Sequence, residues 1–198
     1  MPLSGPGLQG LLTPLMTASQ IKGTSAPSMV MAISNAVSSW LTSLQIQTTD
    51  VGLMGPAGVG IGKAILQPAS LIGPLQGMAT ANQLKGTSMP AFMTAIGNGV
   101  ATFVSSMGMV QSNHTTVAVG SGIGQILVVG GPGALQGLLM GQFTANSIKG
   151  TSAASLATAI ANGLATGIVS AIVTVVISGS PVTPPPVTTS GVGMGRLI

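Results

Sequence analysis

One four-residue motif, Lys-Gly-Thr-Ser, occurs three times in this chain of 198 residues, at positions 22–25, 85–88 and 149–152. The spacings between the motifs are nearly equal, and an asparagine follows each lysine at a constant distance, as Asn35, Asn98 and Asn162. Self-similarity at a fixed period is the signature of a protein built from repeated supersecondary units. We therefore expect three tandem repeats, with boundaries at 1–67, 68–130 and 131–198.

Two further motifs accompany each copy. Leu-Gln-Gly precedes the Lys-Gly-Thr-Ser motif at 8–10, 75–77 and 135–137. A run in which every second residue is glycine lies near the end of each repeat, at 58–62, 120–124 and 191–195. Alternating segments lead into these runs, as a short extended strand would. A strand of glycines can lie close against another backbone.

The segment after each motif has the pattern of an amphipathic helix. Thr-Ser can act as the N-cap, with its hydroxyl accepting from the first free amides, and Pro27 and Pro90 fall in the first turn, where proline is tolerated. Apolar residues then recur at helical spacing in each copy. A shorter apolar segment precedes each motif, which predicts a helix-turn-helix in every repeat.

The fold class that these patterns indicate is mainly α, with short extended glycine-rich segments. Large residues in one stripe correspond to small residues in another, which favours one shared core over three separate cores. The three helix-turn-helix repeats could be arranged around a pseudo-threefold axis or stacked in a line. The proline-rich insertion at 180–186 predicts a stiff spacer that carries a C-terminal glycine-rich arm away from its helix.

The sequence contains few charged residues, and this low charge content excludes several classes of function. Charged residues are 3% of the chain, against about 25% in a typical soluble domain. Five scattered cations and few aromatics do not form the basic, stacking surface of a nucleic-acid binder. The sequence has no cysteine and one histidine, His114, so we predict no metal site and no cofactor. The N-terminal segment also lacks the basic region of a secretory signal.

Catalytic patterns are missing as well. Asp50 is the one acidic residue, so paired-carboxylate catalysis is excluded, and Lys-Gly-Thr-Ser does not have the order of a phosphate-binding loop. We expect no enzymatic activity.

The basic residues occupy only two positions of the repeat. One position holds Lys22, Lys85 and Lys149, and the other holds Lys63 and Arg196. All five are candidate partner-binding residues. The first three precede predicted helix N-termini, where the helix dipole adds to the attraction for an anion or a partner's carboxylates; the alternative for these three is that they are solvated turn residues.

Cysteine-free repeats rich in Gly, Ala, Ser and Thr, with almost no charge, resemble small virion proteins of tailed bacteriophages, especially tail and baseplate components. The resemblance covers the composition and repeat style of the whole chain. It implies a tail-tip, baseplate or hub role, as a structural subunit that joins other virion proteins. Three copies in one chain can also present approximate threefold symmetry, which suits the chain to a threefold or sixfold symmetric partner. No functional residue is carried over from it.

Two alternatives remain open. The first is a membrane-inserted or pore-forming helical repeat protein, located in a membrane, because the run 156–177 carries no charge and has the length of a bilayer span. In that case helices 88–110 and 152–178 would contact lipid. The second is an isolated repeat scaffold that binds a partner through its lysine-bearing edge.

Overall fold

The computed structural model describes residues 4–44, 46–51, 58–64, 69–114, 119–128, 131–169, 172–178 and 190–197, and it describes side chains for 4–44, 71–106 and 131–169. It is mainly helical, as predicted. Each third of the chain runs through two helices and then two strands. The helices are α1 (Gly5–Ala18), α2 (Ala26–Ser43), α3 (Ala69–Ala81), α4 (Met89–Met107), α5 (Gly131–Ala145) and α6 (Ala153–Val169); the strands are β1 (Ile46–Val51), β2 (Gly58–Ala64), β3 (Gly108–His114), β4 (Val119–Val128), β5 (Ile172–Ser178) and β6 (Ser190–Leu197).

The six helices form a closed ring. Each helix packs against the helix before it and the helix after it in the chain, and α6 packs against α1. Two kinds of contact therefore alternate around the ring: contacts within a unit, such as α1 with α2, and contacts between units, such as α2 with α3. Because the last helix meets the first, the units do not form an open line.

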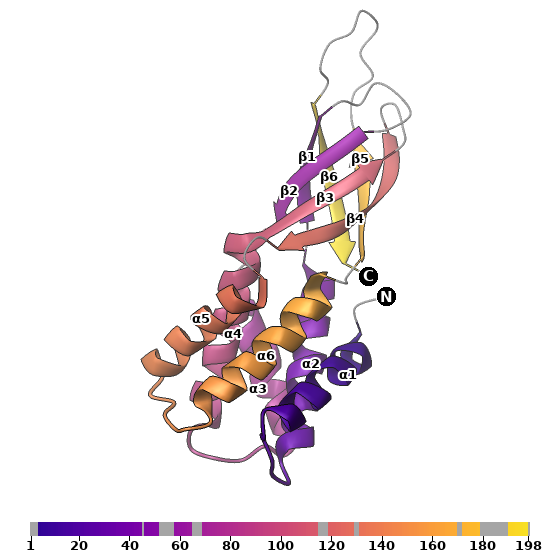
Figure 1. Ribbon diagram of the computed structural model, residues 1–198. Helices are drawn as coiled ribbons and strands as arrows, with labels where there is room; N and C mark the ends of the chain where they lie inside the picture. The colour runs from indigo at the N-terminus through magenta and orange to yellow at the C-terminus, as the bar shows by residue number, and fades with distance from the viewer. Residues whose placement is uncertain are drawn as a thin grey trace, which may run out of the picture.

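The six strands form a closed antiparallel barrel in the order β1-β2-β3-β4-β5-β6, with β6 paired to β1. Each unit contributes one antiparallel pair, and β2, β4 and β6 each pair with the first strand of another unit. Helices α2, α4 and α6 contact the barrel at one end, so the molecule consists of a helical layer and a barrel above it (Figure 1). Closure leaves no unpaired edge strand in the barrel.

The glycine runs lie in β2, β4 and β6. Because successive residues of a strand alternate between its two faces, the three glycines of each run share one face of their strand. The register pairs them with residues of β1, β3 and β5 on that same face: Thr48 stands opposite Gly62 and Gly193, and Ser112 stands opposite Gly60 and Gly124. Side chains just fill an eight-stranded barrel, and a six-stranded barrel is narrower. A face on which every second strand carries glycine, which has no side chain, agrees with this narrow barrel.

The helical layer has one core. Its buried hydrophobic residues form a single cluster that draws on all six helices, so the shared core is correct for this layer. Compensation of volume is visible where Trp40, Phe103 and Gly167 occupy the same position of the three units. A methyl group at Gly167 would meet Leu8 of α1, so a leucine from the first unit takes the space that an aromatic ring fills elsewhere.

The register of the units differs in one detail from the sequence alignment. Three non-glycine residues with positive φ, Gln20, Gln83 and Ser147, have the same spacing as the lysines. With that spacing, Leu71 corresponds to Leu8, and the Leu-Gln-Gly of the second unit is displaced by about one helical turn. Leu75 therefore corresponds to Leu12 and Leu139; all three are fully buried.

Two predictions for the C-terminal part of the chain were wrong. The last glycine run is not an arm, because β6 pairs with both β5 and β1 and closes the barrel. The uncharged run 156–177 is not one helix either, since α6 ends at Val169 and β5 begins at Ile172. The proline-rich insertion at 180–186 lies outside the described residues. Among the helices that the structure describes, none has the length and apolar character needed to cross a bilayer.

Candidate interaction surface

The first helix of each unit ends in the same backbone arrangement. In the first unit Gln20 has a φ of 57°, the amide of Ile21 donates to the carbonyl of Met16 at 2.9 Å, and the amide of Gln20 donates to the carbonyl of Thr17 at 3.1 Å. These two bonds define a Schellman motif. Leu84 and Ile148 make the same bond to Ala79 and Phe143, at 2.9 and 2.8 Å. The chain is therefore turned identically three times.

The motif glycine completes the turn. Gly23, Gly86 and Gly150 have φ values of 154°, 154° and 147°, a backbone conformation that other residues rarely adopt. The carbonyl of each glycine accepts from an amide three residues later, that of Ala26, Met89 or Ala153, at 3.1 Å. These three residues are the first of α2, α4 and α6, so the predicted helix starts are confirmed.

The predicted capping by Thr-Ser is wrong in the first unit. Ser25 is the N-cap residue of α2, but its φ of −89° and ψ of −7° are already helical and its side chain makes no capping hydrogen bond. The backbone turn supplies the acceptor instead, through the carbonyl of Gly23. A helical backbone at the N-cap directs the hydroxyl away from the amides that an extended residue would reach.

Three of the five candidate partner-binding residues lie at one end of the molecule. Lys22, Lys85 and Lys149 are all exposed, and their turns lie at the end of the helical layer that is remote from the barrel (Figure 1). The other two do not join them. Lys63 lies in β2 opposite Gln47 and Met109, and Arg196 lies in β6 opposite Thr174; their side chains are outside the described part.

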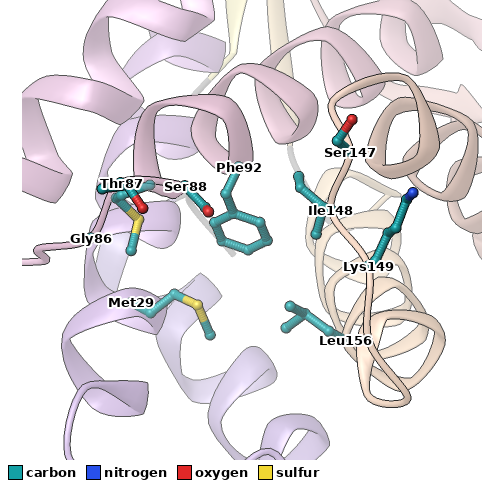
Figure 2. Close-up of a pocket in the computed structure, with 10 residues that line it drawn as sticks. Met29, Gly86, Thr87, Ser88, Phe92, Ser147, Ile148, Lys149 and Leu156 are labelled. Atoms are coloured by element: carbon teal, nitrogen blue, oxygen red, sulfur yellow. The ribbon is translucent and has the colours of Figure 1, made fainter.

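A depression of about 500 Å³ opens between the three units at the lysine-bearing end. Its apolar lining includes Met29 from α2, Phe92 from α4 and Leu156 from α6, whose side chains point toward a common space in Figure 2, and also Met89 and Ile148. The first three occupy the same position of the three units, seven residues after their lysines. Met29 and Leu156 are half-buried, and 7% of Phe92 is exposed.

Two of the turns form the rim of the depression. Gly86, Thr87 and Ser88 come from one turn, and Ser147, Ile148 and Lys149 from the next. Phe92 is held at the base of the rim by Phe143 of the neighbouring unit, with ring centroids 5.6 Å apart and ring planes at 37°. That separation lies within the range of favourable aromatic pairs, so the wall of the depression is supported by packing between units.

Electrostatics at this end are of one sign. The ranges for which side chains are described contain no aspartate or glutamate, because Asp50 is the only acidic residue of the sequence and lies in β1. The lysines of the turns therefore have no carboxylate partner within the helical layer. An apolar recess with Lys149 on its rim can bury an apolar group and attract an anion.

Sequence reasoning identified the lysines but missed the recess. Met29, Phe92 and Leu156 belong to the apolar helix stripes that the sequence predicts to face the core, and Phe92 lies in the core cluster while Met29 and Leu156 pack against it. The usable signal was their common repeat position close to the lysines, since equivalent residues at the same helix end must approach one axis when the units close in a ring. No family model, no curated protein and no solved structure matches this chain.

Proposed function

We propose that this chain is a non-enzymatic structural subunit that joins other proteins of a large assembly, and that the assembly is the tail of a tailed bacteriophage, at its baseplate or hub. The observation that carries the proposal is the closure between the first unit and the last, through α6 with α1 and β6 with β1. Closure gives one chain two different ends, each built from three units.

The contacts between units support a pseudo-threefold arrangement. A leucine at one repeat position meets a helix of the preceding unit at two of the junctions: a methyl group added at Gly99 would lie 2.9 Å from Leu139, and one added at Gly163 would lie 2.5 Å from Leu12. The strand pairings between units repeat in the same way. A chain with this symmetry can occupy the axis of a threefold or sixfold partner while presenting one copy of itself.

The composition supports a surface that neighbours cover. With 3% charged residues, the chain has little of the charge that keeps isolated proteins apart in solution. Contact with other subunits would satisfy such a surface, since the cores of protein interfaces are depleted in charge. The proposed location in a tail is supported by the compositional resemblance to tail and baseplate proteins.

Particle fractionation tests the proposal. An epitope-tagged chain is expressed during infection, particles are banded on a density gradient and washed with high salt, and the chain is quantified by mass spectrometry. We expect the chain to remain with the particles in a constant ratio to a tail protein. The same chain is mixed with liposomes and floated; stable flotation together with absence from particles would contradict the proposal and favour a membrane role.

A further inference from the structure

The depression between the three units has the properties of a docking site. It lies where three equivalent side chains, Met29, Phe92 and Leu156, converge, and no described residue of the chain covers it (Figure 2). Other large apolar residues of the helical layer, such as Leu15, Met78 and Leu138, are also half-buried. The recess differs from them in that equivalent apolar side chains from all three units line one open space at the lysine-bearing end.

We propose that this recess receives an apolar tip, flanked by carboxylates, that projects from a different protein of the assembly. The inference rests on the proposed function, because it names the chemistry of the partner at one end of the subunit. The apolar tip would bury the exposed parts of Met29, Phe92 and Leu156. The flanking carboxylates would approach the ammonium groups of Lys22, Lys85 and Lys149.

Charge complementarity selects this occupant. A second copy of the chain would bring the same three exposed lysines toward this end if it docked head to head, and like charges repel. A second copy that docked through its barrel would offer only Asp50, the one acidic residue in its three units. A different protein with several carboxylates supplies the missing sign without this conflict. Lys149 on the rim, together with the exposed lysines of the other two turns, would chiefly accelerate association and select the partner, while buried apolar contact would determine how long it stays.

The shape of the recess agrees with a protruding tip. It is bounded by residues of α2, α4 and α6 and by two of the turns before these helices, and those turns are held by backbone hydrogen bonds between 2.8 and 3.1 Å. Preformed walls require little reorganisation when a partner binds. A volume of about 500 Å³ is within the usual range of small pockets, roughly 300–1,000 Å³.

Photo-crosslinking in the assembled particle tests the inference. A photoreactive phenylalanine analogue is placed at Thr87, which is exposed and lines the recess, and in a matched control at Thr13, which is exposed on α1 away from it. After irradiation, cross-linked peptides are identified by mass spectrometry. We expect Thr87, and not Thr13, to capture a segment of another protein in which an apolar residue is flanked by aspartate or glutamate.

Charge variants separate the two parts of the site. Lys22→Gln, Lys85→Gln and Lys149→Gln are combined, with Lys→Arg at the same three positions as the control that keeps the charge. We expect the glutamine variant to lose the cross-link at least about tenfold at low salt, as for a steered association, and the arginine variant to retain it. A separate Leu156→Asn variant should lose the cross-link at every salt concentration.

The outcomes are distinguishable. A chain that is present in particles but cross-links from Thr87 to a second copy, to lipid, to a segment without carboxylates, or to nothing overturns this inference and leaves the structural role intact. A chain that is absent from particles overturns the structural role and this inference with it. Unchanged cross-linking in the triple glutamine variant also overturns the inference, because the lysines would then be solvated turn residues.

Discussion

Gly163→Ala is the substitution that most sharply probes the junction between the last unit and the first. Gly163 lies in the middle of α6, and a methyl group there would stand 2.5 Å from Cδ2 and 3.0 Å from Cγ of Leu12. Leu12 belongs to α1 and is fully buried, so the surrounding core side chains restrict how far it can move. The expected effect is therefore a conflict between α6 and α1.

Two terms of opposite sign decide the magnitude. Replacing a glycine by alanine inside a helix stabilises the folded state by about 1 kcal/mol, whereas adding volume to a well-packed contact costs about 1–3 kcal/mol. For Gly163→Ala the second term dominates, and we expect a net loss of about 1 kcal/mol in the free energy of unfolding. Gly99→Ala meets Leu139 at 2.9 Å and should be milder.

Gly137→Ala is the matched control, because Gly137 lies in the interior of α5, is exposed, and has no atom within 4 Å of the added methyl position. It should gain about 0.5–1 kcal/mol from the helix term alone. Both variants are compared by urea unfolding, followed by far-ultraviolet circular dichroism. If Gly163→Ala stabilises the protein as much as Gly137→Ala does, then α6 is not packed on α1 and the closed ring is wrong.

Three further variants test the packing and the turns. Ser34→Ala should stabilise the protein by about 1 kcal/mol, because the buried Ser34 hydroxyl has no hydrogen-bond partner; urea unfolding checks this, and destabilisation would show that the hydroxyl is satisfied. Gly150→Ala should destabilise by about 1–3 kcal/mol, since its φ of 147° strains any other residue; a melting temperature equal to that of wild type would refute it. Phe143→Ala should cost about 3–5 kcal/mol by emptying a buried site; a loss below 1 kcal/mol in calorimetry would mean that the ring does not support Phe92.

The helical part of the fold was accessible to sequence reasoning because its signals are local. A motif that contains glycine precedes each second helix, and an apolar stripe of helical period follows it, so the starts at Ala26, Met89 and Ala153 could be predicted. The N-cap hydrogen bond could not, because the choice between a side-chain cap and a backbone turn depends on ψ at Ser25, which sequence does not reveal. The Leu-Gln-Gly of the second unit shows the same limit. Its sequence matches the other two copies, but the constant spacing of the units aligns Leu71, and not Leu75, with Leu8.

The closed barrel and the recess depend on contacts between units, and those are not local. Strand β6 was predicted as an arm because prolines precede it, yet its partners are β5 and β1, and β1 belongs to the first third of the sequence. Pairing of that range is decided by closure of the whole ring. The recess likewise exists only after three units meet, when Met29, Phe92 and Leu156 approach one axis. A repeat period identifies equivalent positions, but it does not indicate which of them face one another in the folded chain.

Stoichiometry in purified particles tests the central claim most directly. If one chain provides all three faces of a pseudo-threefold adaptor, quantitative mass spectrometry with isotope-labelled peptide standards should find one copy of it for every three, or every six, copies of the symmetric tail protein to which it cross-links. A chain that is absent from particles, or present in equal numbers with that partner, would contradict the account.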